Sequence, residues 1–169
     1  MPDRLTVFAS WWLQGKPLLP PHDMFMRIDD NLGITLFRMN EFQVQLFTFK
    51  PNFEVVDHRH PGVDSYEVYV GGDLYIRHKG EMTLTPEMVE SGKAIGTLIR
   101  IKPEDWHGGY TGPRGGTFIS IQEWANKSPT SIHLDWEGPS SGKDHQRELD
   151  CNGKANTENG ATGLPHPDS

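Results

Sequence analysis

Short runs in which hydrophobic and polar residues alternate, separated by glycine and proline, are the feature that most constrains the fold of this chain. The 169 residues include 18 Gly and 13 Pro, and many of these lie between the runs. Alternation places successive side chains on opposite faces of a strand, while Gly and Pro favour turns. The pattern predicts an all-β sandwich or barrel. The predicted strands span 33–38, 42–49, 54–59, 66–70, 73–78, 96–101 and 117–124, and 132–136 is a further candidate.

Three segments depart from this pattern. Residues 1–32 contain Trp11 and Trp12 and then several prolines, which stop a helix or a central strand, so we expect an arm that packs on the barrel or on the second subunit of a homodimer. Residues 85–91 carry Pro at a first helical position and predict one helical turn. From 138 to 169 hydrophobic residues nearly vanish, which predicts a disordered tail.

The part between arm and tail, 33–137, is expected to form one barrel domain. Its glycine-rich pieces, 71–73 and 112–116, lack the spacing and the following helix of a phosphate-binding loop. They therefore predict hairpin turns.

Charge and cysteine content exclude several classes of partner. Sixteen Lys and Arg against 23 Asp and Glu give a net charge of −7, which repels nucleic-acid phosphates and anionic lipids. No hydrophobic run approaches the ~20 residues that span a bilayer. The lone Cys151 cannot form an internal disulfide. We expect a cytoplasmic protein that binds neither nucleic acid nor membrane.

The histidines are the candidates for chemistry. His58 and His60 form an HxH pair in a predicted strand, where both imidazoles point to one face. A third imidazole, His107, follows a later strand, and Asp64 or Glu67 supplies a carboxylate after the turn. Such a set holds one divalent transition metal: Fe, Mn, Ni or Zn. An HxH pair alone is more often a hydrogen-bonded pair than a pair of metal ligands, so the residues around it decide between these two interpretations.

The spacing resembles two motifs of the cupin superfamily, which read G(X)5HXH(X)3–4E(X)6G and G(X)5PXG(X)2H(X)3N. Asp stands where the first motif has Glu, and the second motif lacks its turn Gly and its Asn. The resemblance covers about 33–125 and implies a double-stranded β-helix, or jelly-roll barrel, with a metal inside and often a homodimer. The matching residues are His58, His60, Asp64 and Gly71, then Gly96, Pro103 and His107.

Alternation also predicts a pocket. On one face of 42–49 and of 117–124 a polar amide lies beside aromatic residues, as a small-molecule site needs. The alternative is that these amides satisfy neighbouring groups in the barrel. The candidates for substrate contacts are Gln45, Tyr69, Arg100 and Gln122.

The resemblance implies a metal-dependent enzyme that acts on a small polar molecule inside the barrel, either a dioxygenase or an isomerase or lyase. If Asp64 is the ligand, Glu67 remains as the catalytic proton shuttle. The alternative is a cupin without turnover that serves in ligand binding, sensing or assembly, because one fold hosts many roles.

Overall fold

The computed structural model describes residues 2–14, 25–28, 31–130, 132–138 and 146–148. Within these ranges nine strands form one antiparallel sheet, which confirms the all-β expectation. The strands are β1 (Phe25–Ile28), β2 (Asn31–Met39), β3 (Phe42–Phe49), β4 (Phe53–His58), β5 (Val63–His78), β6 (Glu81–Leu84), β7 (Leu98–Ile101), β8 (His107–Trp124) and β9 (Gln146–Glu148).

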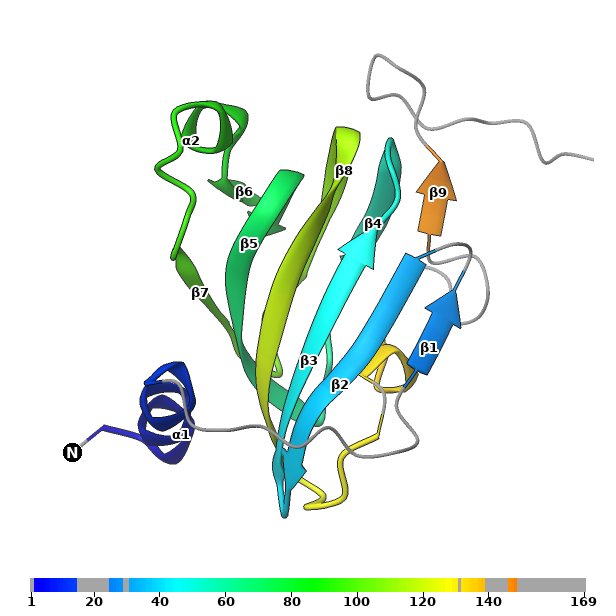
Figure 1. Ribbon diagram of the computed structural model, residues 1–169. Coiled ribbons are helices and arrows are strands. Elements are labelled where there is room, and N and C mark those ends of the chain that lie inside the picture. Colours follow the sequence, from blue (N-terminus) through cyan, green and yellow to red (C-terminus); the bar gives the residue numbers. More distant parts are fainter. Residues whose placement is uncertain (1, 15–24, 29–30, 131, 139–145, 149–169) are drawn as a thin grey trace, which may run out of the picture.

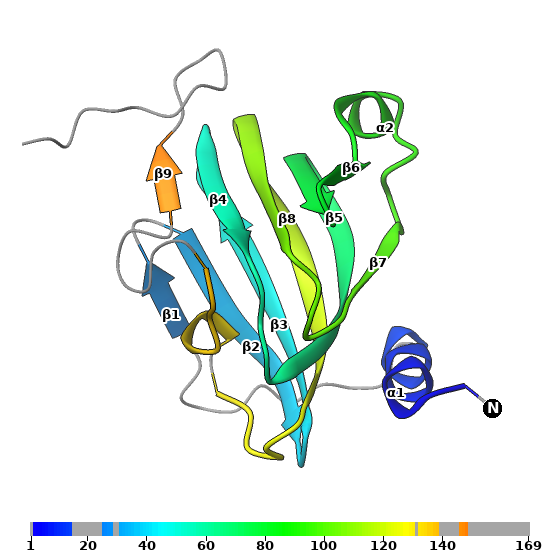
Figure 2. The same ribbon diagram turned by 180° about the vertical axis from the view of Figure 1, so that it is seen from behind.

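Two long strands, β5 and β8, pair along their whole length and join the two halves of the sheet. The C-terminal half of β8 pairs with β3, and its N-terminal half pairs with β4. The hydrogen-bonded order is β1-β2-β3-β8-β4-β9, with β6 and β7 attached to β5. Figures 1 and 2 show the result, a sheet that curls into an open barrel.

The two glycine-rich pieces are corners inside strands, not the hairpin turns expected from the sequence. The predicted strands 66–70 and 73–78 are one strand, β5, with register shifts on both sides of Gly72. Gly72 has φ +84° and faces the corner of β8, where a Cβ would lie 2.5 Å from the carbonyl oxygen of Gly115. Only glycine fits this close approach, because any side chain would clash with the neighbouring backbone.

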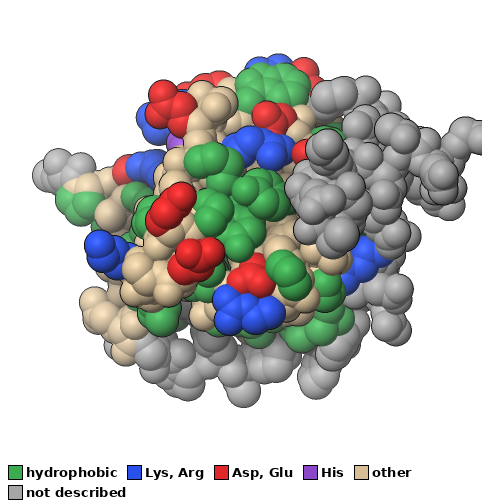
Figure 3. All heavy atoms as spheres, turned by 90° about the horizontal axis from the view of Figure 1, so that it is seen from above, with side chains coloured by type: hydrophobic (Ala, Val, Ile, Leu, Met, Phe, Trp, Pro, Cys, Tyr) green, Lys and Arg blue, Asp and Glu red, His purple; other side chains and the backbone are tan. Residues whose placement is uncertain are grey.

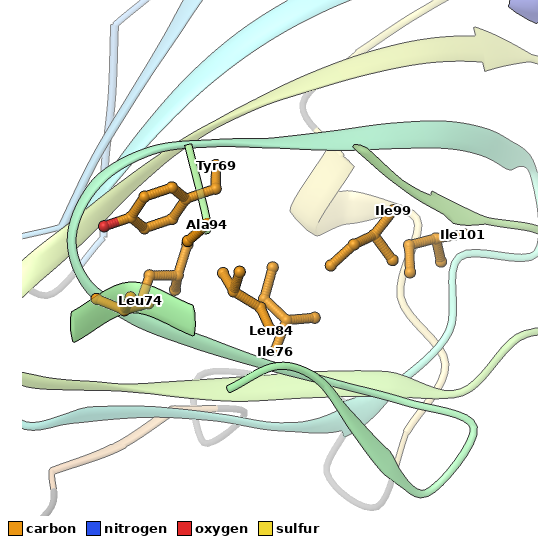
Figure 4. Packing of buried hydrophobic residues seen from close by; sticks show 8 residues of the cluster. Tyr69, Leu74, Ile76, Leu84, Ala94, Ile99 and Ile101 are labelled. Carbon is orange, nitrogen blue, oxygen red and sulfur yellow. The ribbon is translucent and has the colours of Figure 1, made fainter. Parts of the chain in front are cut away.

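Hydrophobic side chains fill the space inside the curve of β5. Figure 4 shows these side chains, and the β5 members lie against others from β6, from β7 and from the helix α2 (Pro86–Glu90). The cluster consists of Tyr69, Leu74, Ile76, Leu84, Val89, Ala94, Ile99 and Ile101. The helix α2 confirms the helical turn predicted at 85–91, and its N-cap is Thr85, whose Oγ1 accepts a hydrogen bond from the Met88 amide at 3.3 Å.

The N-terminal segment forms a helix, α1 (Arg4–Leu13), outside the barrel. Leu5, Phe8 and Ala9 recur at the spacing of one helical face and are buried against outward-facing side chains of β3 and β8, such as Val44 and Ile121. The helix ends before the prolines. It covers the barrel of its own chain, and the expected homodimer stays a prediction.

Two other expectations need correction. Residues 132–136 are not a strand, because Ile132–Leu134 form a 3-10 helix, η1. In the predicted tail Gln146–Glu148 form β9, which pairs with β4, while the rest of the tail, including Cys151, lies outside the described residues.

The surface seen from above carries hydrophobic side chains in its middle, with acidic and basic side chains around them (Figure 3). In the part of the chain that the structure describes, no helix is long and apolar enough to cross a membrane.

Candidate metal centre

Three histidines meet inside one end of the barrel. His58 ends β4, His60 follows two residues later, and His107 begins β8, where it lies opposite His58 in the ladder. One ligand atom of each lies within 4.8 Å of the others, and the Nε2 atoms of His58 and His60 are 3.1 Å apart. The structure therefore brings together the three imidazoles that the sequence singled out.

Each of these rings is held from behind by the main chain. Every Nδ1 atom lies against a backbone carbonyl oxygen, which only accepts hydrogen bonds, so Nδ1 carries the hydrogen and Nε2 presents its lone pair. The pairs are His58 with Val56 at 2.8 Å, His107 with Asp105 at 3.1 Å, and His60 with Asp135.

This geometry fits a metal ion. Two nitrogens bound to one ion at ~2.0–2.1 Å lie roughly 2.9–3.4 Å apart for octahedral to tetrahedral angles, and the Nε2 atoms of His58 and His60 are separated by 3.1 Å. Burial, and next the charge of His60, lower the pKa of His107 to about 3, while its hydrogen bond to Asp105 acts the other way. His107 is therefore neutral near pH 7, the form that binds metals.

Residues 132–138, which we call the strap, complete the site. The carbonyl oxygen of Asp135 accepts the hydrogen bond from His60. The indole of Trp136 stacks on the imidazole of His58, with ring centroids 3.7 Å apart. The strap thus orients two of the three imidazoles, although it lies more than 70 residues further along the chain.

Backbone and side-chain bonds fasten the strap to the loop after β4. Arg59 and Glu137 exchange two backbone hydrogen bonds of 2.9 Å, and their side chains form a bidentate ion pair with two contacts of 2.8 Å. The Asp135 carboxylate also accepts a hydrogen bond from the Gly62 amide at 2.7 Å. Sequence reasoning missed Asp135 and Trp136, because no local pattern signals a contact over this distance.

Glu67 lies on β5 and lines the same pocket as the histidines. Its Oε1 accepts hydrogen bonds from Ser65 at 2.7 Å and from Ser120 at 2.9 Å, while its Oε2 is buried without a hydrogen-bond partner among the described residues. Burial raises its pKa to about 7, and the two hydroxyls partly oppose that shift. The carboxyl group can therefore hold or release a proton near neutral pH.

Asp64 and Arg100 lie on the opposite face from the histidines. The Arg100 guanidinium donates to both carboxylate oxygens of Asp64, at 3.1 and 2.8 Å, and also to Asp3 beside α1. Asp64 is therefore not brought to the histidines as a ligand, and Arg100 is not brought to the pocket. Both faces of β5 carry hydrophobic residues because α1 covers the outer one. Alternation alone therefore did not show which face of β5 points into the barrel. The sequence signal for this helix was the spacing of Leu5, Phe8 and Ala9 on one helical face.

The other candidates for substrate contacts point inward but do not line the pocket. Gln122 donates to Gln45 at 3.1 Å and accepts from Gln43 at 3.0 Å, in a buried amide network. The Tyr69 hydroxyl donates to the carbonyl oxygen of Gly72 at 2.7 Å. These side chains satisfy neighbouring groups, which is the alternative that the sequence left open.

The pocket itself has a volume of about 910 Å³, counting the space at its open mouth. Its walls are mostly hydrophobic and aromatic, and the histidines form one part of its lining. Concave pockets with hydrophobic walls and a few polar groups that point to one place are typical of small-molecule sites.

Comparison with solved structures places the fold. KdgF from Halomonas sp. superposes with a TM-score of 0.54 at 11% identity, over 70% of this chain and 98% of that one. An RmlC-like cupin from Shewanella frigidimarina gives 0.51 at 18% identity, over 63% and 87% of the two chains. A predicted oxalate decarboxylase from Thermotoga maritima gives 0.50 at 12% identity, over 64% and 99%. No protein-family model and no curated protein matches the sequence.

The strand order, the two bent strands and these superpositions agree with the resemblance seen in the histidine motifs. The protein therefore has the cupin fold, a jelly-roll barrel of antiparallel strands.

Proposed function

We propose that this protein is a metal-dependent enzyme that acts on a small molecule inside the barrel. His58, His60 and His107 would hold one divalent ion of iron, manganese, nickel or zinc. The observation that carries the proposal is the hydrogen bonding of all three Nδ1 atoms to backbone carbonyl groups. This arrangement directs the lone pairs of three neutral Nε2 atoms to one place.

An ion held by the three histidines would supply Lewis-acid chemistry, because three neutral ligands would leave its positive charge uncompensated. Among the residues described in the lining, Glu67 is the only carboxylate. It lies outside the group of ligand atoms formed by the three histidines. We therefore assign it to proton transfer and not to the ligand set.

Glu67 is held for this role by two hydroxyl groups. Ser65 and Ser120 both donate to Oε1, which leaves Oε2 to take or give the substrate proton. The hydrophobic walls offer few other partners for a proton, so we expect it to pass between the carboxyl group and the substrate. A buried carboxyl group with one oxygen left for the substrate suits proton transfer, which favours isomerisation or elimination over the dioxygenase alternative.

Metal analysis tests the proposal. Protein purified without added metal or chelator is expected to contain about one equivalent of a transition metal, and His107→Ala is expected to lose it. Asp64→Asn is the matched control, since Asp64 lies on the outer face, and it should retain the metal. Absence of metal from the wild type, even after reconstitution, would leave a cupin that binds ligands without metal chemistry.

A further inference from the structure

The walls of the pocket away from the histidines are aromatic. Four phenylalanines line them, and their rings contact one another with centroid distances of 5.2 Å for Phe47 and Phe118, 5.6 Å for Phe49 and Phe118, and 5.6 Å for Phe49 and Phe53. Leu74 and Ile76 extend this surface. A polar substrate body would lose its water along these walls, because the polar side chains of the lining other than the histidines and Glu67 are confined to Asn31, Tyr110 and Ser120 among the described residues.

Apart from the histidines, the described lining of the pocket also lacks a basic side chain that could form an ion pair with an anion. Among the residues that the structure describes, its lining contains no lysine and no arginine. Several arginines of the barrel are instead engaged in ion pairs elsewhere: Arg59 with Glu137, Arg77 with Glu54 and Asp57, Arg100 with Asp64, and Arg114 with Asp73. A phosphate or carboxylate held away from the metal would therefore be buried without a partner, which is strongly unfavourable.

We propose that the substrate is a largely hydrophobic molecule of aromatic-ring size with a single oxygen-donor group and no second anionic group. This inference rests on the proposed function, because the oxygen-donor group binds the metal held by the histidines. The ring lies among Phe47, Phe49 and Phe118. Sugar phosphates and extended dicarboxylates are excluded by the same walls. The substrate is thus less polar than the sequence led us to expect.

Three hydroxamic acids with the same chelating group test this on the zinc-loaded protein. Benzohydroxamic acid should bind about tenfold to a hundredfold more tightly than acetohydroxamic acid, because the phenyl ring enters the aromatic walls. 4-Carboxybenzohydroxamic acid should bind at least about tenfold more weakly than benzohydroxamic acid, because its distal anion is left unpaired. Calorimetry gives the affinities, and elemental analysis after dialysis checks that zinc remains.

A variant supplies the missing cation. Phe49→Lys should reverse the preference, so that the carboxylated compound binds more tightly than benzohydroxamic acid. Val70→Lys is the matched control, because Val70 is 46% exposed on the outer face, and it should keep the wild-type preference. The affinity comparison in the wild-type protein keeps the test informative even if Phe49→Lys impairs folding.

The outcomes separate the two proposals. Equal affinity for acetohydroxamic and benzohydroxamic acid at full zinc content would overturn the substrate class and leave the metal site standing. Tight binding of the carboxylated compound to the wild type would do the same. Failure to bind any of iron, manganese, nickel and zinc would overturn the proposed function and, with it, this inference.

Discussion

The indole of Trp136 stacks on the imidazole of His58, with 3.7 Å between the ring centroids and 7° between the ring planes. The two rings come from the strap and from the end of β4. The stack restricts the rotation of a ring whose Nδ1 is already held by the Val56 carbonyl group. Trp136 is therefore a positioning residue for the metal centre.

Replacement of this indole should weaken the metal site. We expect Trp136→Leu to lower zinc affinity about tenfold or more, since partners that orient a ligand ring usually contribute to this extent. Competition with a chromophoric chelator measures the affinity. Trp11→Leu serves as control, because Trp11 packs at the outer face on Phe8 and Phe37. Equal affinity in the two variants would contradict the positioning role.

The buried carboxyl group of Glu67 should make stability depend on pH in the metal-free protein. Its pKa is raised from 4.5 to about 7, so between these values the folded state binds more protons than the unfolded state. The free energy of unfolding should therefore fall as pH rises from about 4.5 to 7, by about 3 kcal/mol, and level off above.

Urea unfolding in the presence of a chelator, at several pH values, tests this dependence. Glu67→Gln should flatten the profile across that window, whereas Glu81→Gln, at an exposed position of β6, should leave it as in the wild type. A profile for Glu67→Gln that parallels the wild type would show that another group titrates.

The ion pair between Arg100 and Asp64 should stabilise the fold without contributing to the pocket. Arg100→Gln removes both of its contacts with Asp64 and the contact with Asp3 that ties α1 to β7. We expect a loss of about 1 kcal/mol in the free energy of unfolding, because the pair is partly exposed to solvent. Zinc and hydroxamate binding should not change. A large loss of ligand affinity would instead support the substrate contact predicted from the sequence.

The amide network should be structural. Gln122→Leu keeps the volume but leaves the donors of Gln43 and Trp124 without their acceptor, which costs about 2–3 kcal/mol in a buried site. Thermal or urea unfolding measures this loss. Gln14→Leu, at an exposed position after α1, should change stability little. If Gln122→Leu were as stable as the wild type, the network would not be structural.

Much of the fold followed from local patterns. Alternation in β3 and in the C-terminal half of β8 correctly placed Gln45, Phe47, Phe118 and Ser120 on inward faces, because side-chain direction in a strand depends only on the period of two. The HxH spacing likewise placed His58 and His60 on one side. These features need no knowledge of distant contacts.

Three features depended on contacts between distant parts of the chain. The inward face of β5 was ambiguous because α1 buries its outer face, so the sequence left open which of Asp64 and Glu67 faces the histidines. The glycine-rich corners look like hairpin turns until Gly72 and Gly115 meet across two strands. The strap contacts the histidines through tertiary structure, although it is far from them in the sequence.

The sequence by itself thus determined most of the barrel strands, their alternation and the three imidazoles that can chelate a metal. The tertiary structure decided which carboxylate faces them, which groups orient them and what surrounds the substrate. The physical reason is the distance along the chain over which each property arises. Strand periodicity and the HxH spacing are properties of neighbouring residues, whereas burial, hydrogen-bond partners and the pKa of Glu67 arise only when segments far apart in the chain exclude water together.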